Sequence, residues 1–288
     1  MSTDSRDTTA LSAEARYRGM ALSELEWRFI GEESRPGAVQ MALDEIAAET
    51  AAAGGPATVH VYRWTPGTVS LGYSQPRDIL DLDFCERAGI DVTRRQTGGG
   101  TIYHDDWGDI SYSIVAPAAE LPGDLMESYQ LLCEPLFSAF AQLRVDARFV
   151  DEERAAVFEP ACYLRDLHPA HDVVGPDGRK LSGNAQYRQR EAVVQHGSIT
   201  FERATDAHLG IFADCPVSAA DFRDRVGAIT DYADCSRDEA VSAIEDALRE
   251  WSGAEAGGWS DDELERAQAR AREKFANETW VEGRRDPT

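Results

Sequence analysis

Three consecutive glycines at positions 98–100 interrupt the stretch 94–113, which reads RRQTGGGTIYHDDWGDISYS. Because glycine has no Cβ atom, the backbone N–H groups of such a run can turn inward and approach a bound anion closely. After the glycines, Ile110, Tyr112 and Ile114 alternate with serines, and this period-2 pattern is typical of a half-buried strand. The sequence therefore predicts a glycine loop that is held between strands and faces a ligand.

The charged residues near this loop differ from those in the rest of the chain. The formal net charge is -23 at pH 7, with 52 Asp and Glu against 29 Lys and Arg, and the lysines are Lys180 and Lys274. An acid excess with so little lysine is typical of a protein kept soluble in concentrated salt, where screening removes the self-repulsion. We therefore expect a halophilic protein, with an acidic face for a basic partner as the alternative. Arg94 and Arg95, just before the glycines, are suited to bind phosphate or carboxylate.

The bulk composition limits the class of protein. With 288 residues, 42% of them hydrophobic, the chain can form one large domain, or one large and one small domain. It has a polar N-terminus and no apolar run long enough to span a membrane, which predicts a soluble cytoplasmic protein without a membrane partner. Five cysteines without a CxxC pair argue against a disulfide framework or a zinc knuckle. No basic stripe is present, so we expect no nucleic-acid partner.

Hydrophobic periodicity predicts the order of elements. Residues 1–23 are polar and lack a hydrophobic period, so we expect a disordered tail. Helices are expected at 39–53, 78–88, 125–143, 218–248 and 261–275, and strands at 27–30, 59–64, 69–73, 145–150, 180–185 and 193–201. The turns at 65–67 and 187–191 each predict a hairpin between the strands on either side, and the loop-like stretch 151–178 is long enough to be functional. The late helices predict a small appendage that closes on the main domain.

Lys180 lies in a second motif, GRKLSGNAQ at 178–186. If adaptation to salt has removed lysine almost everywhere, a retained lysine is expected to do something that arginine cannot. An ammonium group is a compact point charge that can follow a moving phosphate or carbonyl oxygen, whereas a guanidinium group is a rigid planar fork. The alternative is a surface lysine tolerated by chance.

A cysteine and three histidines are further candidates. Cys162 lies in the long loop before Lys180, and a thiol near an ammonium group becomes a better nucleophile, although a lone loop cysteine is more often inert. His168 and His171 could bind a metal, but no third ligand cluster is visible, so solvated loop histidines are favoured and no metal site is predicted. His196 alternates with apolar neighbours on a strand, which favours a buried, hydrogen-bonded histidine over a general base.

Three ordered blocks together resemble the biotin and lipoate protein ligase superfamily, on the lipoate side. The blocks are MALDE at 41–45, the glycine stretch at 94–113, and GRKLSGNAQ at 178–186 followed by HGSI at 196–199. The resemblance spans roughly residues 26–205. A glycine triplet alone would be a weak signal, whereas three blocks in this order are a strong one.

The resemblance implies a fold and a product. The fold would be α+β, a mixed β-sheet flanked by helices as in class II synthetases and biotin-lipoate ligases. A catalytic domain would span 24–210, and a helical C-terminal segment at 211–288 would pack on it. The product would be an amide on a lysine of a lipoyl domain, in 2-oxoacid dehydrogenase complexes or in the H protein of the glycine cleavage system.

The resemblance also implies roles for individual residues. Lys180 would contact the activated acyl group as a catalytic residue, and Cys162 would be an acyl-thioester nucleophile. The residues implied to bind the acyl-adenylate or the acyl chain lie in the glycine and lysine blocks and in the strand that follows. They are Arg94, Arg95, Gly98, Gly99, Gly100, Tyr103, His104, Asp105, Ser182, Gly183, Ala185 and His196.

Three functions stay open, because members of this family activate the acyl group in different ways. The form of the glycine block resembles lipoate-protein ligase A, which uses ATP and Mg²⁺ to make lipoyl-AMP, and this is our first expectation. The position of Cys162 resembles octanoyltransferases, which take octanoate from acyl carrier protein through a cysteine thioester and need no cofactor. The third function is a non-catalytic subunit that binds lipoate. Some ligases place an accessory domain on a separate chain, so a separate accessory subunit is a further partner implied.

Overall fold

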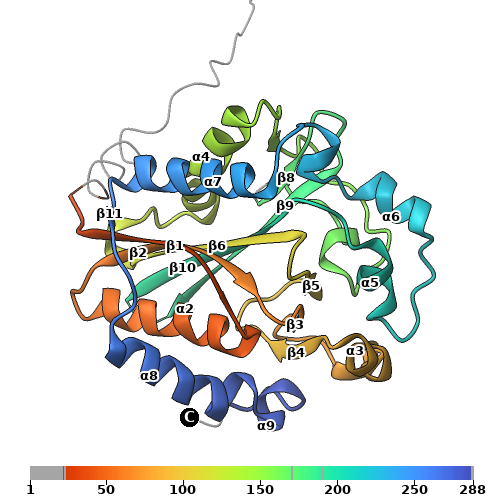
Figure 1. The fold of residues 1–288 in the computed structure, drawn as a ribbon, viewed down its shortest axis with the longest axis horizontal. Helices are drawn as coiled ribbons and strands as arrows, with labels where there is room; N and C mark the ends of the chain where they lie inside the picture. The colour runs from red at the N-terminus through yellow and green to blue at the C-terminus, as the bar shows by residue number, and fades with distance from the viewer. Residues whose placement is uncertain (1–21, 23, 170, 190, 287–288) are drawn as a thin grey trace, which may run out of the picture.

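The computed structural model describes residues 22, 24–169, 171–189 and 191–286, so the tail predicted at 1–23 lies outside the described residues apart from Leu22. Two β-sheets are flanked by helices, as Figure 1 shows. Parallel and antiparallel pairs occur in both sheets. The predicted α+β fold, a mixed sheet flanked by helices, is therefore confirmed.

The larger sheet holds eight strands in the order β11-β1-β2-β6-β10-β9-β8-β7. In chain order they are β1 (Trp27–Arg35), β2 (Ala57–Trp64), β6 (Asp109–Pro117), β7 (Arg148–Phe149), β8 (Asp172–Val174), β9 (Lys180–Gln189), β10 (Ala192–Thr200) and β11 (Glu255–Ala256). The smaller sheet has the order β4-β3-β5, with β3 (Thr68–Leu71), β4 (Asp91–Arg94) and β5 (Ile102–His104). The glycine loop connects β4 to β5, so the smaller sheet holds both of its ends.

The two predicted hairpins have different outcomes. The one formed by β9 and β10 is confirmed, because these strands pair antiparallel from Ala192 opposite Gln189 to Ile199 opposite Ser182. The hairpin predicted around 65–67 is wrong, since β2 and β3 belong to different sheets. Both edges of β2 are already occupied, by β1 on one side and β6 on the other. The chain therefore leaves the larger sheet after β2, and β3 starts the smaller one.

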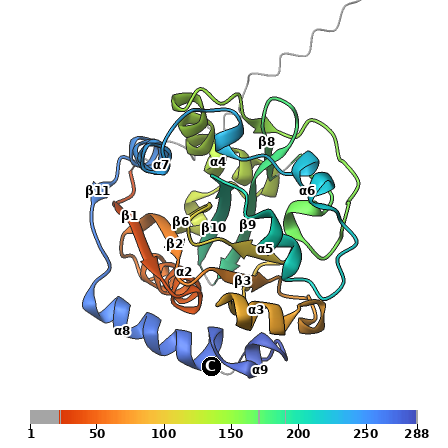
Figure 2. The ribbon, with the colours of Figure 1, turned by 45° about the vertical axis from the view of Figure 1, so that its right-hand side comes forward.

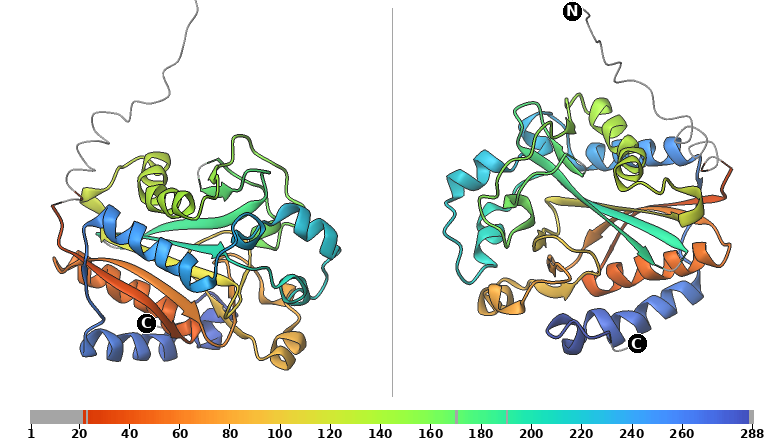
Figure 3. Two further views of the ribbon diagram at one scale, coloured as in Figure 1. Left: turned by 45° about the horizontal axis from the view of Figure 1, so that its top comes forward. Right: turned by 180° about the vertical axis from the view of Figure 1, so that it is seen from behind.

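Helices cover both faces of the larger sheet (Figures 1 and 2). Helices α4 (Leu125–Gln142) and α7 (Arg237–Ser252) pack against each other on one face, while α2 (Gly37–Ala52) covers the other face with α8 (Asp261–Arg270) outside it. Seen from behind, β9 and β10 run between α4 and α2 (Figure 3, right). The shorter helices are η1 (Arg77–Ile79), α3 (Leu82–Ala88), η2 (Ala118–Glu120), η3 (Cys162–Leu164), α5 (Thr205–Gly210), α6 (Ala219–Arg225), η4 (Ile229–Asp231), the π-helix η5 (Ala271–Phe275) and α9 (Glu278–Val281).

Local sequence sets the ends of these helices. Ser236 and Glu239 form a reciprocal capping box at the start of α7, and Gly253 ends the helix with a left-handed backbone at φ 66°. At the start of α3, the side chain of Asp81 accepts a hydrogen bond from the backbone N–H of Phe84 at 2.8 Å. The helix predicted from residue 78 therefore begins four residues later, at Leu82, after the 3₁₀ turn η1.

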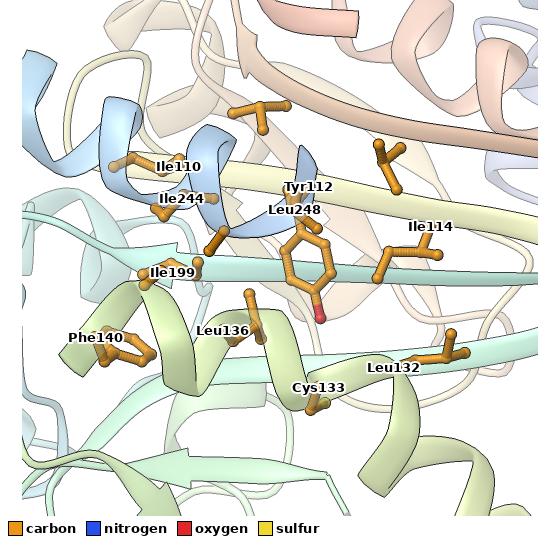
Figure 4. Close-up of a cluster of buried hydrophobic side chains, with 14 of the residues drawn as sticks. Ile110, Tyr112, Ile114, Leu132, Cys133, Leu136, Phe140, Ile199, Ile244 and Leu248 are labelled. Carbon is orange, nitrogen blue, oxygen red and sulfur yellow. The ribbon is translucent and has the colours of Figure 1, made fainter. Parts of the chain in front are cut away.

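The main core lies between the larger sheet and the helices α4 and α7 (Figure 4). Its members include Ile110, Tyr112 and Ile114 of β6, Leu132, Cys133, Leu136 and Phe140 of α4, and Ile244 and Leu248 of α7. Burying a large aliphatic side chain contributes about 1.5–3 kcal/mol. The C-terminal segment therefore supplies part of the core, and its strand β11 pairs with β1. The domain division at residue 210 stays a prediction.

None of the helices in the described part of the chain is both long and apolar enough to cross a bilayer.

Candidate active site

A cavity of about 240 Å³ lies between the glycine loop, the loop around residue 162 and the strands β9 and β10. Ten of the predicted site residues line it: Arg95, Gly98, Gly99, Gly100, His104, Cys162, Lys180, Gly183, Ala185 and His196. Four others, Arg94, Tyr103, Asp105 and Ser182, are not part of its wall. Residues far apart in the sequence therefore meet in one cavity. Gly98 and Cys162, for example, are more than 60 residues apart and both line it.

Lys180 and Cys162 face each other in this cavity. Lys180 is the first residue of β9 and is 2% exposed. Its Nζ atom lies 4.0 Å from Cys162 Sγ and donates a hydrogen bond to the carbonyl oxygen of Cys162 at 3.1 Å. Gly183 adjoins the pair, because a Cβ atom there would lie 3.5 Å from both Lys180 Nζ and Cys162 Sγ. The retained lysine is therefore not a surface residue.

Asp172 in β8 neutralises the buried ammonium group. Lys180 Nζ lies 2.7 Å from Asp172 Oδ1, and both side chains are almost fully buried. Burial acts to lower the pKa of Lys180, but Asp172 and Cys162 outweigh it, so the pKa is raised above its ordinary value. Burial likewise acts to raise the pKa of Asp172, and Lys180 and His171 hold it well below the usual range. At neutral pH the pair is therefore an ammonium and a carboxylate.

Cys162 differs from the buried cysteines of the chain. Burial, with a contribution from Asp81, raises the pKa of Cys85 to about 11, and burial raises the pKa of Cys133 to about 12. Both thiols lie in hydrophobic cores. Cys162 is half-buried and, among the described cysteines, is the one that lines the cavity. A thiol beside an ammonium group in an accessible cavity is the arrangement that favours a reactive thiolate.

The glycine loop packs directly against the segment that carries Cys162. A Cβ atom at Gly100 would lie 2.6 Å from Cys162 N and 2.8 Å from its Cα. The backbone N–H of Cys162 donates to Thr101 O at 2.8 Å, and Thr101 N–H donates to Pro160 O at 2.7 Å. Gly99 adopts φ +90°, which glycine tolerates best. The glycines therefore permit the close approach that sets the position of Cys162.

The two arginines before the glycines bind the protein backbone. The Arg94 guanidinium is fully buried and donates to the carbonyl oxygens of the 72–75 turn and of Val281. The Arg95 guanidinium donates to the carbonyl oxygens of Ser70, Gly98 and Gly100, at 2.6–2.9 Å. The sequence suggested free donors for phosphate or carboxylate, whereas the structure places these donors on main-chain oxygens. A bend that turns its carbonyl groups inward needs hydrogen-bond donors for them, because a buried carbonyl group without a donor destabilises the folded state.

His104 belongs to a buried polar network at one end of the cavity. Its Nδ1 lies 2.6 Å from Asp109 Oδ2, its Nε2 lies 3.0 Å from Ser70 Oγ, and its ring stacks on Trp64 with centroids 4.0 Å apart. Burial lowers the pKa of His104 despite the neighbouring carboxylate of Asp109, so the ring is neutral at pH 7. Asp109 Oδ1 also accepts a hydrogen bond from Ser198 at 2.7 Å. The network fixes one wall of the cavity.

Tyr103 and Asp105 stabilise the turn that follows the glycine loop. The Tyr103 hydroxyl donates to Asp105 Oδ2 at 3.1 Å, and Asp105 Oδ1 accepts from the backbone N–H of Gly108 at 2.6 Å. Ser182 is fully buried, and its hydroxyl donates to Asn184 Oδ1 at 3.4 Å. These three residues support the site from outside the cavity.

His196 is a buried, hydrogen-bonded histidine, as its position on a strand predicted. Its Nε2 lies 3.0 Å from Thr97 Oγ1, and its Nδ1 lies 3.3 Å from Asp44 Oδ2. It lines the cavity and connects the glycine loop to helix α2, where Asp44 lies.

His171 reaches the cavity, whereas His168 lies outside the cavity wall. His171 Nδ1 lies 3.6 Å from Asp172 Oδ2, and its ring stacks on that of His168 with centroids 5.2 Å apart. Within the described residues, no group of three or more His, Cys, Asp or Glu side chains is placed to hold a metal ion.

The model of one protein family, the lipoyl protein ligase A/B catalytic domain, matches residues 36–249, most of the chain. The protein belongs to this family. The lipoyl ligase assignment agrees with the resemblance expected from the three motif blocks. The chain is accordingly an enzyme of the lipoate ligase and octanoyltransferase family.

Curated relatives of this lipoyl ligase family member include octanoyltransferases. The chain is 32% identical over 194 residues to octanoyltransferase LipM of Geobacillus kaustophilus, a match that covers 65% of this chain and 69% of the relative. It is 27% identical over 272 residues to octanoyltransferase LipM of Halalkalibacterium halodurans, with 88% and 98% covered. Among solved structures, a bi-partite lipoate protein ligase from Thermoplasma acidophilum matches with a TM-score of 0.75 and 25% identity, over 90% of this chain and 97% of that one.

Sequence reasoning about this lipoyl ligase family member assigned no binding or catalytic role to several wall residues. They are Met41, Tyr62, Trp64, Ser70, Ile102, Ser111, Arg165, Asp166, His171, Asp172, Asn184, Gly197 and Ser198. One of them could have been found, because a buried lysine requires a counter-charge. Asp172 precedes a short apolar strand just before the lysine block, which makes it the nearest candidate on the adjacent strand.

Proposed function

We propose that this protein is a thioester-dependent acyltransferase that forms an octanoyl thioester on Cys162 and passes the acyl group to a lysine of a lipoyl domain. The observation that carries the proposal is the 4.0 Å separation between Lys180 Nζ and Cys162 Sγ inside the cavity. The names of the curated relatives support octanoyl transfer as the reaction. We place the reaction in the cytoplasm, with octanoyl-acyl carrier protein as the donor.

In the first half-reaction, the sulfur of Cys162 attacks the carbonyl carbon of the donor thioester. The new C–S bond forms as the bond to the donor sulfur breaks, and the proton of the Cys162 thiol ends on the donor thiol. Lys180 favours this step because its fixed positive charge stabilises the thiolate and the negative oxygen of the tetrahedral intermediate. Asp172 keeps the ammonium in place and protonated.

In the second half-reaction, the amine of the acceptor lysine attacks the acyl-Cys162 thioester. The C–N bond of the amide forms, the C–S bond breaks, and Cys162 leaves as a thiol after it receives a proton. Lys180 again lies beside the reacting carbonyl group, so one positive charge serves both half-reactions.

An ATP-dependent ligase is the second candidate, favoured by the 25% identity to the bi-partite lipoate protein ligase across nearly the full length of both chains. The residues expected to hold the nucleotide do not fit that role as they stand. Arg94 and Arg95, which the sequence suggested for phosphate, donate to main-chain carbonyl oxygens. We therefore derive no step through ATP, and lipoate as substrate belongs to this second candidate.

Two donor mixtures separate these functions. The purified protein is incubated with a lipoyl domain and either octanoyl-acyl carrier protein or lipoate with ATP and Mg²⁺, and the acceptor is weighed by mass spectrometry. The proposal expects an octanoyl mass gain without ATP that is lost in Cys162→Ala and reduced about 10²-fold or more in Lys180→Ala. A gain that requires ATP and persists in Cys162→Ala would support the ligase instead. No gain in either mixture, with lipoate binding intact, would support a non-catalytic subunit or the need for a separate accessory subunit.

A further inference from the structure

We propose that His171 is the general base that takes the proton from the ammonium group of the acceptor lysine, an inference that rests on the acyltransferase function proposed above. An amine can attack a thioester only after it has lost this proton, and a free lysine has a pKa of about 10.4. At neutral pH the acceptor therefore arrives almost entirely as the unreactive ammonium. A base at the cavity must receive the proton.

The other titratable groups of the cavity wall are unsuited to this task. Lys180 is itself protonated, because its contact with Asp172 raises its pKa above the ordinary value despite burial. Asp172 is a poor base, since the same ion pair holds its pKa well below the usual range. Arg95 donates to main-chain oxygens, and Asp166 forms an ion pair with Arg165 at 3.4 Å.

Of the three histidines in the cavity wall, two are buried and have a close polar neighbour at each ring nitrogen. His104 is held by Asp109 and Ser70. His196 Nε2 lies within hydrogen-bond distance of Thr97 Oγ1 at 3.0 Å, and its Nδ1 lies 3.3 Å from Asp44 Oδ2. His171 differs, because its side chain is about one-third exposed and no described residue hydrogen bonds to its Nε2. Its Nε2 can therefore receive a proton from a group that enters the cavity.

His171 is also oriented for this role. Its Nδ1 faces Asp172 Oδ2 at 3.6 Å, and its backbone carbonyl accepts a hydrogen bond from Asn184 Nδ2 at 2.8 Å. A carboxylate beside Nδ1 favours the tautomer in which Nε2 is the free acceptor and stabilises the imidazolium that forms. The residues therefore lie in the order His171, Asp172, Lys180 and Cys162, with the carboxylate shared between the base and the ammonium.

Two protons leave the acceptor nitrogen in this step. Nε2 of neutral His171 takes one proton from the acceptor ammonium, and the free amine attacks the carbonyl carbon of acyl-Cys162. As the tetrahedral intermediate collapses, the C–S bond breaks and the second proton of the nitrogen passes to the departing sulfur. The products are the amide, the Cys162 thiol and an imidazolium at His171, which returns its proton to water.

The test isolates the second half-reaction. The enzyme is loaded with octanoyl-acyl carrier protein, separated from the donor, and mixed with a lipoyl domain, and the acyl group is followed by mass spectrometry on wild type, His171→Gln and His168→Gln. We expect His171→Gln to load normally but to transfer to lysine about 10²-fold or more slowly at pH 7, within the usual range for general base catalysis. His168→Gln is the matched control, because His168 stacks on His171 but lies outside the cavity wall. We expect it to transfer at a rate close to wild type.

Two further readouts separate a base from a structural residue. Hydroxylamine, whose nitrogen is already uncharged at neutral pH, should discharge acyl-Cys162 at the same rate in wild type and in His171→Gln. The defect should also shrink as the pH rises toward the ordinary pKa of lysine, about 10.4, because the acceptor then arrives as the free amine and needs no base. The titratable groups that face His171 are Asp172 on β8, His168 on the preceding loop, Tyr129 on α4 and, through Asp172, Lys180 on β9.

The outcomes distinguish this inference from the proposed function. If wild type forms no acyl-enzyme on Cys162, the proposed function fails. If wild type loads and transfers while His171→Gln transfers equally fast at pH 7, the acyltransferase stands and the role of His171 is refuted. An equal loss of discharge with hydroxylamine would likewise refute the base and assign His171 a structural role.

Discussion

The guanidinium group of Arg94 donates two hydrogen bonds, from Nε at 2.9 Å and from Nη2 at 2.6 Å, to the carbonyl oxygen of Val281, 187 residues further along the chain. The Trp280 indole N–H returns a hydrogen bond to the carbonyl oxygen of Arg94 at 2.8 Å. The end of the strand that leads into the glycine loop is therefore fixed to the last helix, α9. The C-terminal segment thus helps to hold the glycine loop of the candidate active site in position.

Replacing Arg94 with Met should destabilise the protein. The change leaves the carbonyl oxygens of the 72–75 turn and of Val281 without their donor, and each buried unsatisfied group costs about 1–3 kcal/mol. We expect a loss of about 3 kcal/mol or more in the free energy of unfolding, measured by urea denaturation. Arg87→Met, on the exposed face of α3, is the control and should change this free energy by less than about 0.5 kcal/mol. Equal stabilities for the two variants would contradict the role of Arg94.

Replacing Asp172 with Asn should remove the counter-charge of Lys180. Breaking a buried ion pair on one side costs about 3–5 kcal/mol, because the remaining charge is left uncompensated. We expect a loss of stability of this order at pH 7, together with slower loading of Cys162. A variant as stable and as fast to load as wild type would show that the pair is dispensable.

The pH dependence of this effect follows from the two pKa shifts. The lowered pKa of Asp172 contributes stability above the unfolded-state value, about 3.9, and this contribution is lost as the pH falls toward the folded-state value. The raised pKa of Lys180 contributes stability below its unfolded-state value, about 10.4, and this is lost as the pH rises through the folded-state value. The difference in unfolding free energy between wild type and Asp172→Asn should therefore be largest from about pH 5 to pH 10 and shrink below pH 4.

Adding one methyl group at Gly100 should displace Cys162. A Cβ atom at Gly100 would lie 2.6 Å from Cys162 N and 2.8 Å from Arg165 Cδ, so backbone must move. We expect Gly100→Ala to lose about 1–3 kcal/mol of stability, as overpacked sites do. Gly98→Ala is the matched stability control, because no atom lies within 4 Å of its Cβ position. If both variants unfold at the same urea concentration, close packing against the Cys162 segment is not the reason why position 100 is glycine.

Salt should stabilise this protein. At a net charge of -23, self-repulsion of the folded chain is reduced when the Debye length falls from about 10 Å at 0.1 M salt to about 3 Å at 1 M. We expect the unfolding midpoint to rise when potassium chloride is increased over this range. Chloride is preferable to sulfate in this experiment, because sulfate strengthens apolar burial in any protein. An unchanged or lower midpoint would argue against adaptation to salt.

Local sequence signals predicted the parts of the fold that depend on local chemistry. The alternation of Ile110, Tyr112 and Ile114 gave the central strand β6, and the apolar period of 125–143 gave helix α4. The scarcity of lysine in the sequence indicated that Lys180 has a specific role. The structure agrees, because Lys180 is buried beside Cys162. In each case the signal is a property of residues close together in the chain.

The remaining features depend on contacts between distant segments. The sequence could not assign β3 to the smaller sheet. That assignment requires knowing that β1 and β6 already pair with both edges of β2, and these pairings are not local. Arg94 and Arg95 are neighbours of the same type, and only the position of Val281 and of the glycine carbonyls determines which oxygens they bind. Asp172 was missed because its contact depends on tertiary structure: β8 pairs with β9 so that Asp172 lies opposite Gly183, and its side chain reaches Lys180 Nζ at 2.7 Å.

The most direct test of the account is a chase of the acyl group through Cys162. The enzyme is loaded with octanoyl-acyl carrier protein labelled in the octanoyl group and freed of donor. A digest then locates the label, and a lipoyl domain is added without ATP. The account predicts that the label is found on the Cys162 peptide and then moves to the acceptor lysine within one turnover. An unlabelled Cys162 peptide, in an enzyme that still modifies the lipoyl domain, would contradict it.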